Sequence, residues 1–242
     1  MEPNIRERIG IVRERIERAA TSAGRDPASI TLVAVTKTYP PELVAAAIAA
    51  GASDLGENRV QEAASKIAAL QDVQPAPRWH LIGHLQRNKA RLASELFDLI
   101  HSVDSLRLAE ALSRHMPTGR RMPILLQFNV SGEESKEGFN LPGGIANQAA
   151  LEAMLPEIEQ ILALPNLEIR GLMTVAPMVA EPDQARPTFC ALRELRDELA
   201  RLFPQAQWHD LSMGMTDDMA AAIAEGSTIV RVGRAIFGPR QP

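Results

Sequence analysis

The chain has 242 residues, of which 45% are hydrophobic and 4% aromatic, and its formal net charge is −4. This composition allows one large domain or two small ones around an aliphatic core, and the near-neutral charge gives no indication of a nucleic-acid partner. The single cysteine, Cys190, excludes an internal disulfide and a metal site built on cysteine alone. The N-terminal segment is charged and lacks an apolar signal core, and no stretch reaches the roughly 20 apolar residues of a membrane span. We therefore expect a cytoplasmic protein that makes no contact with a membrane.

An amphipathic helix is predicted over residues 4–20, because Ile5, Ile9, Val12 and Ile16 recur on one face and Arg and Glu occupy the other. After it, short apolar segments alternate with helical patterns. Strands are expected at residues 30–37, 52–56, 79–83, 97–102, 122–130, 168–174, 208–211 and 227–232. Helices are expected at residues 41–50, 60–70, 88–96, 104–115, 147–163, 187–203 and 216–225, with a short turn at 235–237.

Eight strands, nearly all followed by a helix, are the pattern of an α/β protein with a single (β/α)8 TIM barrel. The extra N-terminal helix would pack across one end of the barrel or against its outer ring. The alternative is an open, doubly wound sheet, which would be expected to carry a glycine-rich dinucleotide loop after an early strand. The residues that follow the first strand, 37–40, form no such loop. In a barrel, functional residues lie at the carboxyl ends of the strands.

The first chemical signal is Lys37, which directly follows the apolar, partly β-branched residues 30–36. A lysine at the end of an apolar strand is partly desolvated, which favours the neutral amine and makes it a better nucleophile. Such a lysine can form a Schiff base with an aldehyde, and pyridoxal 5′-phosphate (PLP) is one candidate. Alternatively, Lys37 extends its ammonium group from the strand end to solvent.

The second signal lies in residues 211–218 and 230–238, which join the last two strands to their helices. The corresponding loops of many barrels bind phosphate, together with the N-terminus of a short extra helix. Gly214 and Gly233 would let the backbone approach the anion, and Ser212 would add a hydroxyl donor. Ordinary turn glycines would explain the same pattern.

Two acidic residues, Asp217 and Asp218, would repel a phosphate that they faced, so we expect them to point to solvent, with Thr216 as the N-cap. In a closed barrel, Lys37 on the first strand and these loops on the last strands are neighbours. This adjacency is the main argument for a phosphorylated aldehyde at Lys37.

Several motifs resemble those of the pyridoxal phosphate homeostasis protein family, and together they cover about residues 33–238. They are VAVTK at 33–37, GENRVQE at 56–62, WHLIGHLQRNK at 79–89, HSVDS at 101–105, RGLM at 170–173, LSMGMTDD at 211–218 and VRVG at 230–233. The resemblance implies one PLP-binding domain over residues 1–242, similar to the N-terminal domain of alanine racemase.

The resemblance also implies roles for individual residues. PLP would be held as an internal aldimine on Lys37, and Arg231 would face its pyridine nitrogen. The remaining cofactor-binding residues implied are Asn58, His80 and Met173 around the ring, and Ser212, Met213, Gly233 and the backbone of Arg234 around the phosphate. Many members of the family have Thr at the position of Arg234, so a hydroxyl is lost here.

Members of this family are described as carriers or regulators of PLP, the active form of vitamin B6, without established catalysis. The resemblance thus implies a PLP carrier that is not an enzyme. We further expect a monomer whose partners are PLP and PLP-dependent apo-enzymes. The main alternative is a PLP-dependent amino-acid racemase, which needs a second base opposite Lys37. The one tyrosine, Tyr39, follows Lys37 by two residues, and we expect no second domain to supply another. A Schiff-base aldolase would retain Lys37 but leave Arg231 unexplained.

Overall fold

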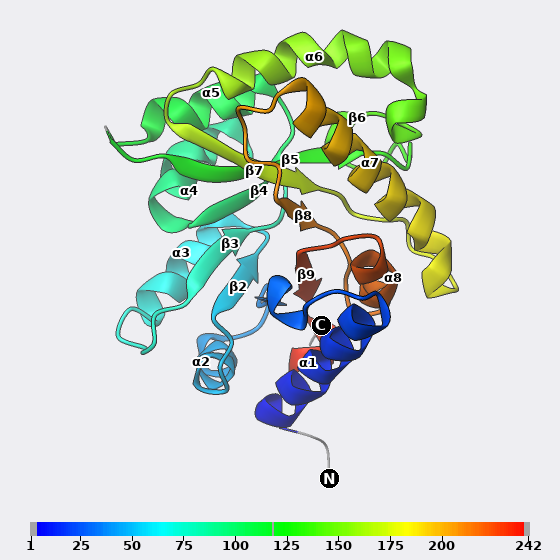
Figure 1. Cartoon of the computed structure of the whole chain (residues 1–242). Helices are drawn as coiled ribbons and strands as arrows, with labels where there is room; N and C mark the ends of the chain where they lie inside the picture. The colour runs from blue at the N-terminus through cyan, green and yellow to red at the C-terminus, as the bar shows by residue number, and fades with distance from the viewer. Residues whose placement is uncertain (1–3, 118, 240–242) are drawn as a thin grey trace.

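A computed structural model of the protein describes residues 4–117 and 119–239. Eight parallel strands form a closed ring, because β4 pairs with both β3 and β5 while β1 pairs with β2 and β9 (Figure 1). The strands of the ring are β1 (Thr31–Val35), β2 (Asp54–Glu57), β3 (Arg78–Leu81), β4 (Leu99–Val103), β5 (Met122–Asn129), β7 (Leu167–Met173), β8 (Asp210–Ser212) and β9 (Ile229–Val232). The predicted TIM barrel is confirmed, and the open sheet is wrong.

The ring carries one short addition, β6 (Phe139–Asn140), which pairs with the end of β5. The helices are α1 (Ile5–Ser22), α2 (Pro41–Ala49), α3 (Val60–Ala69), α4 (Ala90–Leu96), α5 (Leu106–His115), α6 (Gln148–Leu162), α7 (Arg186–Leu202), α8 (Met219–Ala224) and α9 (Arg234–Phe237). Short 3-10 turns lie at η1 (Pro27–Ser29), η2 (Arg87–Lys89), η3 (Gly144–Ala146) and η4 (Pro182–Ala185). Among the described residues, no helix has the length and apolarity needed to cross a membrane.

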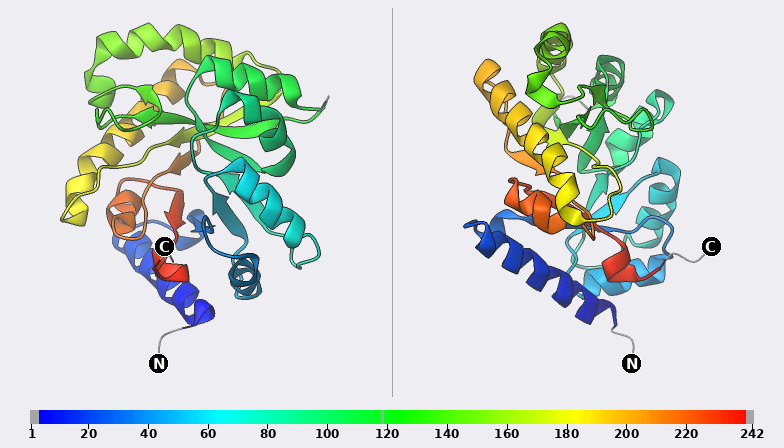
Figure 2. Two further views of the ribbon diagram at one scale, coloured as in Figure 1. Left: turned by 180° about the vertical axis from the view of Figure 1, so that it is seen from behind. Right: turned by 90° about the vertical axis from the view of Figure 1, so that its right-hand side faces the viewer.

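The N-terminal helix α1 belongs to the outer ring of helices. It begins at a capping box in which Asn4 and Glu7 exchange hydrogen bonds with each other's backbone. Its apolar face packs against α8, α9 and α2, and the views from behind and from the side place it next to the last elements of the chain (Figure 2). Of the two positions expected for this helix, the structure has the one in the outer ring.

Nearly all strand boundaries differ from the prediction by one or two residues, and the first strand ends at Val35 and not at Lys37. Two of these differences have a common cause. The last strand but one begins at Asp210 and not at Trp208, so His209 lies before it and is exposed. The fourth strand begins at Leu99 and not at residue 97. In both cases a buried aromatic side chain just before the strand, Trp208 or Phe97, mimics the apolar pattern of the strand itself.

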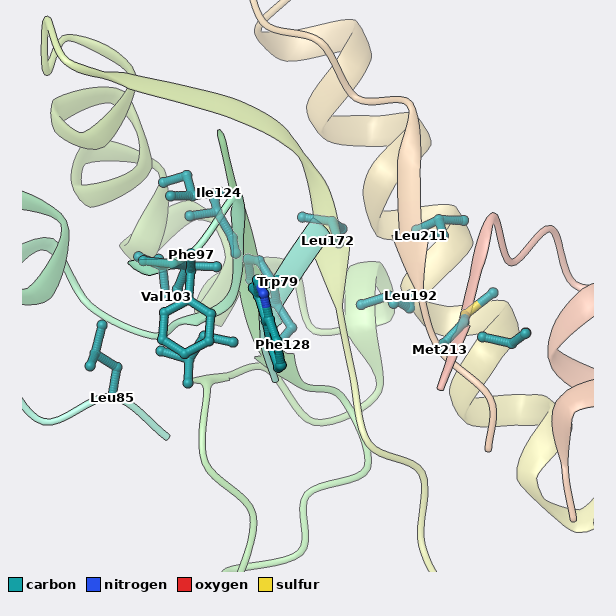
Figure 3. Packing of buried hydrophobic residues seen from close by; sticks show 14 of the residues in the cluster. Trp79, Leu85, Phe97, Val103, Ile124, Phe128, Leu172, Leu192, Leu211 and Met213 are labelled. Atoms are coloured by element: carbon teal, nitrogen blue, oxygen red, sulfur yellow. The ribbon is translucent and has the colours of Figure 1, made fainter. Parts of the chain in front are cut away.

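The apolar residues form two clusters because successive side chains of a strand point to opposite faces of the sheet. The large outer cluster fills the space between strands and helices, where Trp79, Phe128, Leu192 and Leu211 pack (Figure 3). The small inner cluster lies within the barrel and consists of Val33, Leu99, Leu125, Met173 and Ile229, with Val175 beside it. The remaining inward-facing positions are mostly polar, and they define the candidate site.

Gly171 provides a test of this architecture, since it lies in β7 at a φ of +155° and a Cβ there would overlap the backbone of Asp210 in the neighbouring strand. We expect Gly171→Ala to lower the free energy of unfolding by about 3 kcal/mol or more. The matched control is Gly10→Ala in α1, where an added Cβ meets open space and should raise stability by about 0.5–1 kcal/mol. Urea titration followed by circular dichroism measures both. Equal stabilities of the two variants would contradict the β7–β8 packing.

Candidate functional site

Several of the predicted cofactor residues lie near the carboxyl ends of neighbouring strands. Register pairs Ser212 of β8 with Met173 of β7, which lies in the inner cluster, so both side chains face the barrel interior. Arg231 pairs with Val33 of β1, which lies in the same cluster. Lys37 follows β1 by two residues and is half-buried. The first and last strands of the barrel therefore bring Lys37 and Arg231 to the same end of the same seam.

Arg231 is the buried cation of the site. Its side chain is 5% exposed, and its guanidinium donates to Ser212 Oγ at 2.5 Å and to the backbone carbonyl of Thr174 at 2.8 Å. Burial lowers the pKa of Arg231 to about 10, although the charge of Asp218 acts in the opposite direction. A pKa of about 10 leaves the guanidinium charged at neutral pH.

From Arg231 a continuous line of hydrogen-bonded side chains crosses the interior of the barrel. Ser212 Oγ lies 2.8 Å from His101 Nδ1, and His101 Nε2 lies 2.9 Å from His80 Nδ1. His80 Nε2 lies 2.9 Å from Asp54 Oδ1 at the far end. None of these four side chains belongs to a residue more than 3% exposed. His80, expected beside the cofactor ring, thus has both ring nitrogens engaged deep in the barrel.

The two ends of this line have opposite electrostatic character. Burial raises the pKa of Asp54, but the hydrogen bonds from His80 and Ser53 and the charge of Arg78 outweigh it, so this pKa lies below its usual value. Burial lowers the pKa of His101 well below its ordinary value, and positive charge at His80 and Arg231 acts in the same direction. The line therefore runs from a cation through a neutral imidazole to a carboxylate.

The backbone on both sides of Lys37 is fixed by charged side chains of α3. Lys66 Nζ donates to the carbonyl oxygen of Thr36 at 2.6 Å, and the N–H of Thr38 donates to Glu62 Oε1 at 2.5 Å. Thr38 has a φ of 70°, a left-handed conformation that is unfavourable for a β-branched residue. These bonds offset the cost of that conformation and so define the direction in which Lys37 leaves the strand.

A buried glutamate completes this arrangement. Glu57 is 0% exposed, and its Oε1 accepts from Lys66 Nζ at 2.7 Å and from the Thr36 hydroxyl at 2.6 Å. Lys66 also lies 2.7 Å from Glu62, so one buried ammonium serves two carboxylates. Burial raises the pKa of Glu57 against the lowering effect of its bonds from Lys66 and Thr36.

One of the two loops predicted to bind phosphate, the loop after β9, lies beside the end of β1. Gly233 directly precedes α9, and a Cβ added to it would lie 3.3 Å from the carbonyl oxygen of Val35 in β1. The N–H groups of Arg234 and Ala235 occupy the first turn of α9, where a helix offers no internal acceptor. The Arg234 side chain is exposed and bonded to Asp217, so only its backbone is directed to this place.

Three expectations about the loop after β8 need correction. Asp218 does not face solvent: it is 7% exposed, occupies the N-cap position of α8 in place of Thr216, and accepts from the N–H of Met215 at 2.5 Å. Asp217 is exposed, as expected. The side chain of Met213 packs in the outer cluster near Leu192 and Leu211, because it follows Ser212 and points to the opposite face (Figure 3). Met213 can contribute only its backbone.

Asn58 carries a buried polar atom that a bound ligand could contact. Its Oδ1 is buried and has no hydrogen-bond partner among the described residues. The bare backbone of Gly83 lies against Asn58, since a Cβ there would come within 2.5 Å of its carbonyl oxygen. The unpaired Asn58 Oδ1, the buried guanidinium, the half-buried lysine and the first-turn N–H groups of α9 fit the ring hydroxyl, pyridine nitrogen, aldehyde and phosphate of PLP.

Other histidines lie outside this arrangement. His84 is exposed, and its Nδ1 lies 3.1 Å from Asp104 and 3.9 Å from Glu137. The ligand atoms of these three residues lie within 4.8 Å of one another, which is within reach of a divalent ion and equally typical of an exposed ion pair. His80 and His84 are four residues apart but do not share a site.

Sequence reasoning missed Glu57, Lys66, Asp54 and the role of His101. Their signal was a charged or polar residue at an inward or buried position of an otherwise apolar element. Glu57, for example, ends a strand whose four residues are all buried. Which partner each one has depends on contacts between different strands and helices, which a pattern along one element does not contain.

Comparison with known proteins agrees with the fold and the site. The family model for the N-terminal domain of alanine racemase matches residues 10–241. The structure of alanine racemase from Clostridium difficile has a TM-score of 0.68 at 14% identity, covering 99% of this chain and 57% of that chain, and shares the fold. The protein is thus a barrel of the alanine racemase N-terminal domain class.

More similar proteins define the family within that class. The pyridoxal phosphate homeostasis proteins of Pseudomonas aeruginosa and Escherichia coli are 44% and 43% identical, with 98% of this chain covered and 96% and 97% of theirs. PipY of Synechococcus elongatus, solved with PLP bound, has a TM-score of 0.76 and 41% identity over 92% of this chain and 99% of that chain. The chain belongs to the pyridoxal phosphate homeostasis protein family.

The buried ion pairs around Lys37 lead to a stability prediction. Lys66→Ala would leave Glu57 and Glu62 without their shared cation, so we expect a loss of about 3–5 kcal/mol in the free energy of unfolding. The control is Arg91→Ala, which removes an exposed partner of Glu95 and should cost less than about 0.5 kcal/mol. Chemical denaturation measures both variants. A Lys66→Ala variant as stable as Arg91→Ala would show that this cluster does not hold the Lys37 turn.

Proposed function

We propose that this chain binds PLP covalently through Lys37 and acts as a carrier that maintains the supply of PLP, without catalytic turnover of its own. The observation that carries the proposal is that half-buried Lys37 follows β1 while buried Arg231 lies on β9, the strand that pairs with β1. The family name and the PLP-bound PipY structure support the choice of ligand. We also propose that residues 1–242 act as one PLP-binding domain and that the protein is a monomer in the cytoplasm.

PLP supplies an aldehyde that an amine can capture and a pyridine nitrogen that can draw electrons from a bound amino acid. In this proposal the Lys37 amine would hold the aldehyde carbon of the cofactor, and an incoming amine would take its place when the cofactor is handed on. The bonds at Thr36 and Thr38 hold the base of the Lys37 side chain still, so that its amine meets the aldehyde without a search through backbone conformations.

Arg231 would limit the reactions that the bound cofactor can promote. A guanidinium that stays charged at neutral pH disfavours a second positive charge on a pyridine nitrogen beside it. An unprotonated nitrogen withdraws electrons weakly, so carbanion chemistry at a bound amino acid is slow. This property suits a carrier, which must hold a reactive aldehyde without consuming amino acids.

The alternative function, a racemase, requires a second base on the far side of the ring. Tyr39 does not meet this requirement, because its ring stacks on Phe237 at 4.8 Å and its hydroxyl donates to the carbonyl oxygen of Gly238 at 2.6 Å. The position of Tyr39 between β1 and α9 is that of a packing residue. We propose PLP-dependent apo-enzymes as the recipients of the cofactor.

The covalent link can be tested on the four lysines of the chain. We expect PLP-loaded protein treated with borohydride to carry the reduced adduct on Lys37, located by peptide mapping with mass spectrometry. Lys37→Ala should lose the adduct and the absorbance near ~420 nm expected of a protonated Schiff base. Lys89→Ala, with its lysine on the η2 turn, is the control and should retain both. An undiminished adduct in Lys37→Ala would overturn the assignment.

Carriage and catalysis give different results with amino acids. We expect the PLP-loaded protein to restore activity to a PLP-dependent apo-enzyme, and Lys37→Ala to do so much less. Incubation with single L-amino acids should produce no D-enantiomer above a protein-free PLP blank in chiral chromatography. Racemisation that rises with protein concentration and disappears in Lys37→Ala would favour the racemase instead.

A further inference from the structure

In the line of side chains that leads from Arg231 through the barrel, the donor and the acceptor of each hydrogen bond can be worked out. A guanidinium can only donate hydrogen bonds, and a carboxylate can only accept them. Arg231 occupies one end of the line and Asp54 the other. The direction of every bond between these two ends is then restricted by the number of protons on the two imidazoles.

His101 provides the decisive constraint. It is 0% exposed, and burial keeps its pKa well below the ordinary value, so its ring carries one N–H and one lone pair at neutral pH. Both ring nitrogens are within hydrogen-bond distance of a partner, Nδ1 of Ser212 and Nε2 of His80. Hence His101 donates to one neighbour and accepts from the other.

For a His80 ring that carries a single proton, only one arrangement satisfies every contact. His80 donates from Nε2 to Asp54, which leaves its Nδ1 as an acceptor. His101 must then donate from Nε2, and its Nδ1 must accept the hydroxyl hydrogen of Ser212. The Ser212 oxygen in turn accepts from Arg231. Every bond points in the same direction, from the guanidinium to the carboxylate.

Adding one proton to His80 reverses the middle of the line. A protonated His80 donates from Nδ1 to His101, which must then donate from its own Nδ1 to the Ser212 oxygen. The Ser212 oxygen then accepts hydrogen bonds from both His101 and Arg231, and the Ser212 hydroxyl hydrogen needs a different acceptor. The charge state of His80 is therefore communicated to Ser212, which lies beside Arg231.

The far end of the line, buried Asp54, lies against a cavity. Asp54 and Arg78 line this cavity of about 450 Å³ together with residues of α1 and of the start of β1. Arg78 is 61% exposed at its side chain and lies 2.7 Å from Asp54 Oδ1, and Arg13 and Glu17 line the same cavity. Asp210, paired with Arg170 at 3.1 Å, is the other carboxylate whose charge acts on His80.

We propose that Asp54, His80 and His101 are positioning residues that act through Ser212 to hold Arg231 in one orientation and to order its donors, with Asp54 as the fixed acceptor at the opposite end of the barrel. The proposal rests on the proposed PLP function only in what Arg231 faces. The direction of the line is a property of the protein alone. It assigns Ser212 to Arg231 and His101, and not to the phosphate as the sequence suggested.

The direct test is the tautomeric state of the two histidines in the free protein at neutral pH, from long-range nitrogen–proton correlation spectra of nitrogen-15-labelled protein. We expect both His80 and His101 as Nε2–H tautomers, with His80→Gln and His101→Gln used to assign the signals. A Nδ1–H tautomer of His101 would overturn the proposal. This readout needs no cofactor, so it stands or falls independently of the Lys37 adduct.

The functional consequence is tested with two isosteric variants. Asp54→Asn replaces an obligate acceptor by an amide that can also donate, so we expect mixed tautomers of both histidines and about a tenfold weaker PLP affinity by fluorescence titration. Asp210→Asn removes a neighbouring inward carboxylate that is outside the line, and should leave the tautomers unchanged and the affinity within twofold. Equal effects of the two variants would show a general effect of barrel charge and would overturn the positioning role.

Discussion

A guanidinium charge buried inside the barrel is the constraint on which the site depends. Removing Arg231 from water costs several kcal/mol, and the interior returns that energy only through hydrogen bonds of good geometry. Ser212 and the Thr174 carbonyl supply them directly. Ser212 is itself bonded to His101, and the series continues until it reaches a carboxylate. Hydrogen-bonded side chains from four strands, β8, β4, β3 and β2, thus take the place of water around the Arg231 guanidinium.

The turn that carries Lys37 depends on a second group of buried charged residues, arranged differently from those around Arg231. Arg231 is held through a long neutral line, whereas the Lys37 turn is held by short contacts to Lys66 and Glu62 on a single helix. Glu57 joins these contacts to the strand next to β1. The two anchors use different side chains, but they share β2, which carries Asp54 at its first position and Glu57 at its last.

The sequence predicted the barrel because its signals are local. Apolar segments alternate with amphipathic helices at short intervals. Lys37 follows the first strand and Arg231 lies on the last, so closure of the barrel makes their strands neighbours. The direction of individual side chains was harder to predict. Met213 and Ser212 are adjacent in one motif, yet they point to opposite faces of β8 because strand side chains alternate. Asp218 was assigned to solvent because it would repel a phosphate, whereas it is buried and its carboxylate accepts from the N–H of Met215.

The closing seam of the barrel has a consequence for how the protein is made. Lys37 leaves the first strand and Arg231 lies on the last, and α1 packs against α8 and α9. Almost the whole polypeptide must therefore emerge from the ribosome before either residue has its partner. A nascent chain that has exposed Lys37 has no buried guanidinium and no α9 beside it. The site is absent until synthesis is nearly complete, so truncated products of this chain would not compete with the finished protein for its ligand.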